Sequence, residues 1–282
     1  MAKIPYIGAE DTARKVKKMY VGVDGVARKV KKAYVGVDGL ARLFYSAGMA
    51  FTYSGEYEII GDTSGDWCIS FLTSGDLVFT SLPKDTVDIF LCGGGGNGGT
   101  GRAYGEGGVV WYSGGAGGGG GYRTTAKGIT VTEGTVYPIE IGGASGTSSG
   151  LGKTAAGGNA GETNGYMSAG ASGGSNGGSA HSWSTAGNGV DGEYAFGESA
   201  FATSFGTGYR FGGGGGGGVG YRSSGGVGTP GSGGESGGGK GGINTGNGTS
   251  AITNSGGGGG GAGNGGSAGA GGSGVVIIRN AR

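Results

Sequence analysis

The sequence has few of the residues from which metal sites, disulfide scaffolds and membrane spans are built. Its 282 residues include two cysteines, one histidine and four prolines. Cys68, Cys92 and His181 are too few for a structural zinc site or a disulfide-dense scaffold. No apolar run reaches the ~18 residues that a transmembrane helix needs. The basic N-terminus lacks the apolar stretch and cleavage site of a secretory signal.

The formal net charge is also close to zero, at +1. We therefore expect no overall electrostatic field that would draw the chain to nucleic acid. Ten of the 20 basic residues lie within positions 1–47, so the balance hides a basic N-terminal end.

Glycine is abundant: the chain has 83, a share roughly four times the usual ~7%. The scarcity of proline and the absence of a strict Gly-X-Y pattern exclude collagen. Such a composition usually indicates disorder. However, 34% of the residues are hydrophobic and 9% aromatic, and strand-like patches bracket the glycine-rich part. We therefore expect an ordered glycine-rich region.

The first part of the chain is a 14-residue repeat: YIGAEDTARKVKKM, YVGVDGVARKVKKA and YVGVDGLARLFYSA, starting at Tyr6, Tyr20 and Tyr34. Two Asp-Gly pairs flanked by apolar residues predict tight type I′ turns. Each repeat is therefore predicted to be a strand, a turn and a strand, with one basic, solvated face. A unit this short cannot bury a core alone and must pair with copies of itself or with a partner chain.

We interpret residues 1–49 as an attachment and oligomerisation module. Nucleic-acid binding by its basic residues is the alternative, but alternating valine and lysine is explained more simply by a solvated sheet face. The residues expected to make the contacts are Tyr20, Val21, Val23, Asp24, Gly25, Tyr34, Val35, Val37, Asp38 and Gly39.

Period-2 strands follow in FTYSGEYEII, DWCISFL, DLVFT and TVDIFLC, within residues 50–92. Trp67, Ile69 and Phe71 are expected to share one face, as are Val87, Ile89 and Leu91. Further strands are expected within residues 121–142 and 274–280, and the β-branched run at 275–278 predicts a central strand. Cys68 and Cys92 fall on separate strands that could face each other. Small buried hydrophobes are favoured over a disulfide.

These patterns predict an all-β chain with N-terminal β-hairpin repeats followed by a domain at residues 50–282. That domain is expected to be a small β-sandwich-like unit, whose strands frame polyglycine-rich segments within 93–274. Left-handed polyglycine II helices can pack side by side because glycine lets backbones approach closely. We expect an inserted bundle of this kind, with the intervening segments as turns at its ends.

The N-terminal repeat ARKVKK/YVGVDG resembles the N-terminal segment of tail or tail-fibre proteins from phages and prophages of Gram-positive bacteria. Residues 51–282 are similar to the glycine-rich domain common in such proteins, through FTYSGEYEII, VDIFLCGGGGNGG, YPIEIGG and the closing GGSGVVIIRNAR. Polyglycine bundles also occur in adhesins that tip the long tail fibres of some T-even-like phages. That likeness is architectural only, because no motif carries binding residues over.

The resemblance implies a virion tail component at the host-facing tip, made in the host cytoplasm and extracellular when it functions. Implied partners are other phage tail proteins, a host cell-surface glycan or protein, and further copies of the chain, with a trimer expected by analogy. Nucleic acid and membrane insertion are not expected. A self-assembling structural fibre or decoration subunit without receptor binding is the alternative, and ice binding is a third, weaker hypothesis.

Two motifs mimic nucleotide-binding loops. Residues 96–101 match G-x-G-x-x-G after a strand, and residues 150–154 end like a P-loop, but neither is followed by a helix-forming run. The carboxylates of the glycine-rich region are dispersed and predict no catalytic pair. We expect no enzyme activity, no catalytic residues, no cofactor and no metal.

The aromatic residues between the glycines are the sharpest functional candidates, because polyglycine offers almost no side chains for recognition. Phe196, Phe201 and Phe205 are expected to cap the bundle or wedge it against the β domain. Receptor or partner contact is assigned to Trp111, Tyr112, Tyr166, His181, Trp183, Tyr194, Tyr209 and Tyr221.

Overall fold

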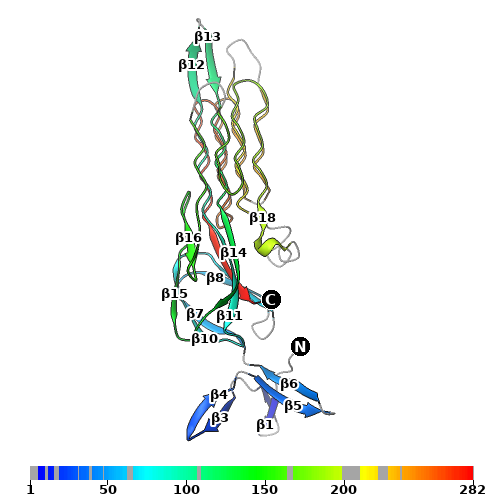
Figure 1. Ribbon diagram of the computed structural model, residues 1–282. Coiled ribbons are helices and arrows are strands. Elements are labelled where there is room, and N and C mark those ends of the chain that lie inside the picture. Colours follow the sequence, from blue (N-terminus) through cyan, green and yellow to red (C-terminus); the bar gives the residue numbers. More distant parts are fainter. Residues whose placement is uncertain are drawn as a thin grey trace.

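A computed structural model gives the fold of the chain, and it runs along one long axis (Figure 1). Three hairpins lie at one end, two packed sheets follow, and glycine-rich segments run lengthwise to the other end. Almost every regular element in the described part is a strand, apart from the short 3₁₀ turn η1 (Ala195–Gly197). The structure describes residues 6–9, 12–15, 19–30, 32–37, 40–46, 48–61, 66–106, 109–163, 168–198, 210–221, 228–235 and 237–281.

The three repeats form three separate antiparallel hairpins, as the sequence predicts. They pair β1 (Tyr6–Ala9) with β2 (Thr12–Lys15), β3 (Tyr20–Val23) with β4 (Val26–Lys29), and β5 (Lys32–Val37) with β6 (Leu40–Ser46).

The turn of the second hairpin confirms the type I′ prediction. Asp24 and Gly25 have φ angles of 50° and 75°, so both central residues are left-handed. Asp38 and Gly39 lie outside the described residues, although Val37 opposes Leu40 just as Val23 opposes Val26.

The expected single basic face is wrong. Arg28 and Lys29 follow one another in β4, so these two positions belong to opposite faces of the strand. The register accordingly sets Val21 against Arg28 and Tyr20 against Lys29.

Two antiparallel sheets make the body of the molecule. The larger has the strand order β14-β11-β20-β9-β8, and the smaller has β15-β10-β7. The closing strand β20 is therefore central, as its β-branched run predicts. The bounds are β7 (Ala50–Tyr53), β8 (Tyr57–Gly61), β9 (Trp67–Phe71), β10 (Gly75–Ser81), β11 (Thr86–Cys92), β14 (Arg123–Thr130), β15 (Val136–Ile139) and β20 (Val275–Asn280).

The core between the sheets confirms the predicted strand faces. Trp67, Ile69 and Phe71 of β9 join Val87, Ile89 and Leu91 of β11 in one cluster with residues of the small sheet. Met49 also belongs to this cluster, so the packed domain begins just before the strand that opens it. The opposite face of the large sheet is covered as well, by Phe196 and Phe211 packing on Phe90 and Ile277.

Cys68 and Cys92 are both buried, and neither forms a disulfide. They lie on β9 and β11, on either side of β20, where Cys68 opposes Arg279 and Cys92 opposes Val275. Four residues along a strand span about 13 Å, well beyond the ~7 Å Cα separation that a disulfide allows. The two thiols therefore do not face each other, and both act as small core residues.

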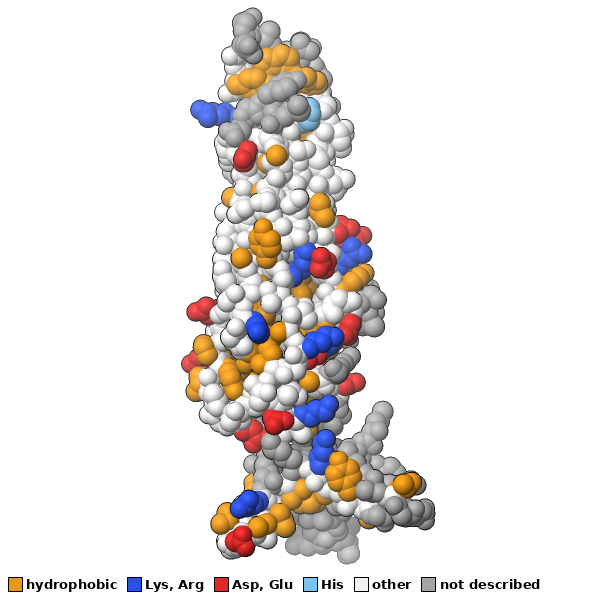
Figure 2. All heavy atoms as spheres, viewed as in Figure 1, with side chains coloured by type: hydrophobic (Ala, Val, Ile, Leu, Met, Phe, Trp, Pro, Cys, Tyr) orange, Lys and Arg blue, Asp and Glu red, His pale blue; other side chains and the backbone are white. Residues whose placement is uncertain are grey.

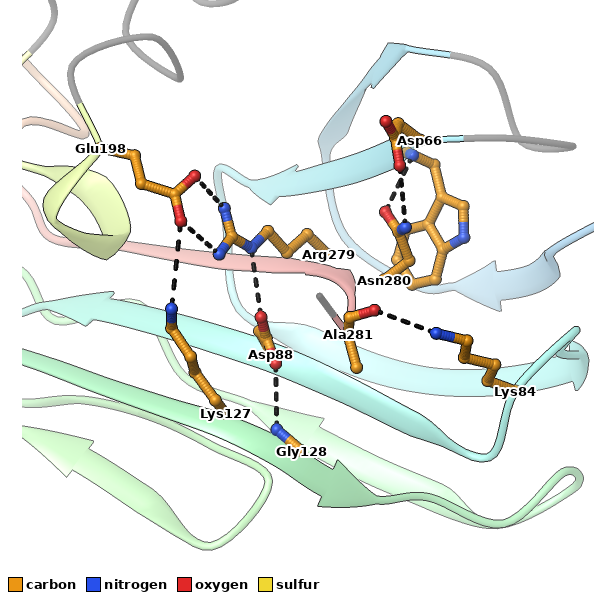
Figure 3. Close-up of polar contacts among 10 residues, drawn as sticks. Asp66, Lys84, Asp88, Lys127, Gly128, Glu198, Arg279, Asn280 and Ala281 are labelled. Carbon is orange, nitrogen blue, oxygen red and sulfur yellow. Dashed lines mark hydrogen bonds and ion pairs between the residues drawn. The ribbon is translucent and has the colours of Figure 1, made fainter. Parts of the chain in front are cut away.

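A buried ion pair fastens η1 onto the large sheet (Figure 3). Arg279 and Asp88 are fully buried and pair across β20 and β11, with 3.3 Å between Nε and Oδ2. The Arg279 guanidinium also donates two hydrogen bonds, of 2.8 and 2.9 Å, to the carboxylate of Glu198. Its Cζ lies 3.9 Å from the centre of the Phe196 ring. Burial alone would lower the pKa of Arg279, but the carboxylates of Glu198 and Asp88 outweigh it and raise that pKa.

The glycine-rich segments bond to one another through their backbones in a regular rotation. Within residues 114–122, every third amide donates to the same neighbouring segment, and the three sets point to three different neighbours. The donors and acceptors are Gly115, Gly118 and Gly121 to Ala262, Gly259 and Gly256; Gly114, Gly117 and Gly120 to His181, Gly178 and Ser175; and Ala116, Gly119 and Tyr122 to Glu162, Asn159 and Ala156.

The same segment accepts hydrogen bonds from three more segments, at residues 93–99, 171–174 and 215–218. Within residues 212–220 and 256–263, the amides of 214–219 and 258–263 also donate to three neighbouring segments in turn. All three inner segments are buried along most or all of their length. We call these three inner segments and the segments that they bond to, which lie within residues 93–274, the glycine bundle.

Glycine is required at many positions inside the bundle because no room remains there for a side chain, although a few positions accept one, such as Ala116 and Ala262. A Cβ on Gly118 would lie 2.1 Å from the carbonyl oxygen of Gly96, and one on Gly215 would lie 2.0 Å from that of Gly259. Both contacts are with backbone, which cannot turn aside as a flexible side chain can.

Three short strand pairs complete the described part of the fold. β12 (Arg102–Glu106) pairs with β13 (Val109–Ser113), and β18 (Glu193–Tyr194) with β19 (Arg210–Phe211). The G-x-G-x-x-G stretch thus leads into a strand and not into a helix. The P-loop-like stretch forms a hairpin of β16 (Ser148–Gly150) and β17 (Lys153–Ala155), whose turn residues Leu151 and Gly152 have positive φ.

Candidate functional site

The hairpin of β12 and β13 projects from the end of the glycine bundle that lies farthest from the N-terminal hairpins (Figure 1). Its register sets Tyr104 opposite Trp111 and Ala103 opposite Tyr112. Because successive residues of a strand point to opposite faces, Trp111 and Tyr112 carry aromatic rings to the two sides of this hairpin.

On one side, four rings form a chain of contacts. Tyr104 lies over Trp111 with 6.5 Å between ring centres and 13° between planes, and Trp111 meets Trp183 at 4.6 Å. Trp183 in turn meets His181 edge-on at 6.3 Å. His181 is positioned by its backbone, because its carbonyl accepts from the amides of Gly114 and Gly220.

On the other side, Tyr112 stacks on Tyr221 with 4.3 Å between ring centres. The amide of Tyr112 also donates to the carbonyl of Tyr221 at 3.2 Å, so backbone and rings hold the pair together. Burial, and then the neighbouring Tyr112 hydroxyl, raise the pKa of Tyr221.

These side chains form what we call the tip aromatic cluster: Tyr104, Trp111, Tyr112, His181, Trp183 and Tyr221. Each is half-buried, so part of each remains accessible. Figure 2 shows apolar side chains gathered at this end, whereas most charged side chains lie over the sheets and hairpins. An accessible aromatic surface next to a glycine bundle with few charges suits binding through ring contacts more than through charge.

The structure separates Tyr194 from this cluster. Tyr194 lies on β18, near the sheets, where the Arg210 guanidinium carbon stands 5.0 Å from its ring centre. Arg210 also pairs with Asp191 at 3.2 Å and Glu235 at 3.6 Å. Tyr194 thus belongs to a charged cluster at the base of the glycine bundle.

Some sequence candidates are not placed by the structure. Tyr166 and Tyr209, together with Phe201 and Phe205, lie outside the described residues. Phe196 packs on Phe90 of the large sheet, with 5.9 Å between ring centres, in the wedging position expected of it.

Two features of the structure were not assigned from the sequence. Tyr104 joins the tip aromatic cluster through its cross-strand position opposite Trp111, and a hairpin signal over 102–113 would have found it. The buried Asp88–Arg279 pair could have been found from the one charged residue in each of two otherwise apolar strands, TVDIFLC and GVVIIRN.

In the described part of the chain, no group of three or more His, Cys, Asp or Glu side chains is arranged to hold a metal ion. Nor does that part contain a helix long and apolar enough to cross a membrane.

Comparison of the chain with protein-family models and with curated proteins found no match.

Proposed function

We propose that this chain is a phage tail protein that binds the host surface through the tip aromatic cluster. In this proposal the glycine bundle is the stalk, and the N-terminal hairpins are the end that joins the rest of the tail. The protein would be made in the host cytoplasm and act extracellularly on the virion. The resemblance of both chain regions to tail proteins of Gram-positive phages supports the assignment, and so does the arrangement of the molecule.

We further propose that the segments of the glycine bundle are polyglycine II helices. That helix has three residues per turn and no internal hydrogen bonds, so its amides point outward in three directions. The donors of residues 114–122 rotate through three neighbours with this period, and the segment contacts six neighbours in all. A helix bundle bonded in all directions would be stiff, which suits a stalk.

One observation carries the functional proposal: five of the eight aromatic candidates converge at one end of the molecule. Trp111 and Trp183 are in ring contact although 72 residues separate them in sequence (183 minus 111). Rigid aromatic side chains supply large contact area at low entropic cost, and they dominate binding hot spots. Aromatic rings also stack on sugar faces, so a cell-wall glycan is the ligand we favour.

The test is binding of the purified full chain to cell-wall preparations from a panel of Gram-positive bacteria. Trp183→Ser and Tyr221→Ser should each weaken binding at least about tenfold, as expected for hot-spot residues. Tyr194→Ser is the matched control, because it removes an aromatic ring remote from the tip, and it should leave binding unchanged. Equal binding by all variants, or no binding to any preparation, would contradict the proposal.

A purely structural subunit is the second candidate, favoured by the exposed side chains of the N-terminal hairpins. Tyr20 and Tyr34 are 54% and 55% exposed, as expected of residues that wait for a partner. Negative-stain images of the purified chain separate the two functions, because a long polymer supports the structural subunit and a small discrete particle supports the adhesin.

A further inference from the structure

The three N-terminal hairpins share one register, which reveals a repeated surface. In each repeat, a tyrosine opposes a lysine or leucine, an apolar residue opposes an arginine, and a glycine opposes an alanine. The glycine–alanine pairs are Gly8 with Ala13, Gly22 with Ala27, and Gly36 with Ala41.

The second hairpin shows what this surface offers. Tyr20 and Gly22 lie on the same face of β3, with Ala27 across from Gly22. Tyr20 is 54% exposed, and a Cβ built on Gly22 would meet no atom within 4 Å. The face therefore presents an exposed ring beside two small residues, Gly22 and Ala27, with open space above Gly22.

The opposite face of this hairpin is apolar with charge at its two ends. Val21, Val23 and Val26 are 50%, 38% and 58% exposed. Asp24 stands at the turn, and Arg28 lies across from Val21, one side-chain pair farther along. A two-stranded hairpin is at best marginally stable alone in water. Covering these exposed valines would therefore stabilise it.

Both faces are complementary to themselves. If a second hairpin packs face to face and antiparallel, the Tyr20 ring of each copy covers Gly22 and Ala27 of the other. Tyr20 and Gly22 are two residues apart along β3, about 7 Å, so both contacts can form at the same time. The same antiparallel arrangement on the other face brings Arg28 of one copy over Asp24 of the other.

We propose that the N-terminal hairpins are covered by the hairpins of a second copy of this chain. Within the described residues no hairpin shares a sheet with another. The apolar side chains of Val21, Val26 and Tyr34 are nevertheless about half exposed, so nothing in the described chain covers them fully. Three tandem hairpins in one chain would add their contacts as linked binding sites do. The inference concerns assembly alone and does not depend on receptor binding.

The first experiment measures the mass of the full chain in solution over a wide concentration range. The wild type should be an oligomer. Tyr20→Ser combined with Tyr34→Ser should weaken self-association at least about tenfold, since buried tyrosines dominate interfaces. Tyr57→Ser is the matched control, because Tyr57 is 42% exposed on β8 of the large sheet. A monomeric wild type would overturn the proposal, as would self-association that the paired variant leaves unchanged.

Cross-linking tests the proposed contact directly, and its readout does not depend on a variant weakening self-association. A Tyr20→Cys chain is mixed with a Gly22→Cys chain and treated with a thiol cross-linker spanning about 10 Å, the separation of packed sheets. The native thiols of Cys68 and Cys92 are buried and should not compete.

The mixed pair should cross-link well above the rate of a Val136→Cys control, whose site is 56% exposed on the smaller sheet. Cross-linking at the control rate would contradict the proposed contact. Cell-wall binding by the same preparations reports separately on the tip, so the two proposals succeed or fail independently.

Discussion

The paired sheets and the glycine bundle exclude water by opposite means. Between the sheets, large side chains fill the space: Phe79, Leu91 and Ile278 are fully buried. In the glycine bundle, backbone packs directly on backbone, and residues such as Gly118 have no room for even a methyl group. The same chain therefore contains one region specified by side-chain volume and another specified by its absence.

The two regions also satisfy their backbone groups differently. Each strand of the sheets bonds to at most two neighbours, in the plane of the sheet. An inner segment of the bundle, such as residues 114–122, exchanges hydrogen bonds with six neighbours around its axis. A two-dimensional ladder leaves two faces for side chains to pack on, whereas bonding in all directions leaves none. This difference explains why the sheets carry the hydrophobic core, and why in our proposal the bundle would bind a ligand only at its end.

The regions are tied together by side chains that reach from the sheet into the bundle. Arg123 of β14 donates to the carbonyl of Gly174 at 2.7 Å and to the hydroxyl of Ser175 at 3.0 Å. It is 11% exposed at the side chain. A guanidinium has five donors in a fixed plane, which suits it to gather several carbonyls where bundle segments begin.

The largest effect should come from breaking the buried pair on the outer face of the sheet. Arg279→Ala leaves Asp88 buried without its charge partner and removes the bidentate contact to Glu198. Loss of one partner from a buried ion pair typically costs about 3–5 kcal/mol. Denaturant unfolding should show a loss of stability in that range.

Arg210→Ala is the matched control for that measurement. Arg210 also bridges two carboxylates, but Asp191 and Glu235 are largely exposed. An exposed ion pair contributes little to stability, so this variant should be little changed. Equal losses in the two variants would show that burial does not set the cost of the Arg279 pair.

A single methyl group should distinguish the bundle from an ordinary core. In Gly118→Ala the new Cβ meets the Gly96 carbonyl oxygen at 2.1 Å, so neighbouring segments must move apart. Overpacking costs typically about 1–3 kcal/mol, and we expect that loss in thermal or denaturant unfolding. The neighbouring Ala116 is fully buried, so the cost depends on the position within the rotation and not on alanine itself.

Gly143→Ala should raise the free energy of unfolding, in contrast to Gly118→Ala. Gly143 is exposed, its φ is not positive, and a Cβ there meets no atom within 4 Å. Replacing such a glycine reduces the freedom of the unfolded chain and should stabilise by about 0.4–1 kcal/mol. If both substitutions were equally harmless, direct backbone packing would not limit the bundle.

Sequence reasoning reached the features that local chemistry encodes. The Asp24-Gly25 turn follows from two residues that tolerate positive φ, and the strand faces of β9 and β11 follow from period-2 alternation. The turn at Leu151 was not predicted, because a leucine with positive φ is no turn signal. FTYSGEYEII was interpreted as one patch, but its two halves became β7 and β8 in different sheets.

The site could be predicted only as a set of residues, and not as a place. Inside the bundle the register between segments leaves no trace in the sequence, because nearly every inner residue is glycine and no side-chain pattern marks its neighbour. That register decides that Trp111 meets Trp183 and that Tyr194 lies elsewhere. Likewise, 81 residues separate Glu198 from Arg279, and only the packed sheet brings them together.

The smallest effect on stability should come from Cys92, at the boundary between the two regions, and this effect should not vary with pH near neutrality. Cys92 ends β11, and its sulfur lies 3.5 Å from the Gly93 carbonyl oxygen and 3.8 Å from that of Gly121. Burial raises the pKa of this thiol to about 12, with Arg123 acting weakly in the opposite direction. The folded state thus favours the neutral thiol, and iodoacetamide should not modify it at mildly alkaline pH without prior unfolding.

The stability that Cys92 contributes through this preference is complete below the ordinary thiol pKa of about 8.5 and is lost as pH rises toward 12. The free energy of unfolding of the wild type minus that of Cys92→Ala isolates this contribution, because the other titrating groups are common to both proteins. The difference should be constant up to about pH 8.5 and fall steadily above it. A difference that stays flat throughout would mean that water reaches the thiol, and that the sheet and the bundle do not seal against each other at this point.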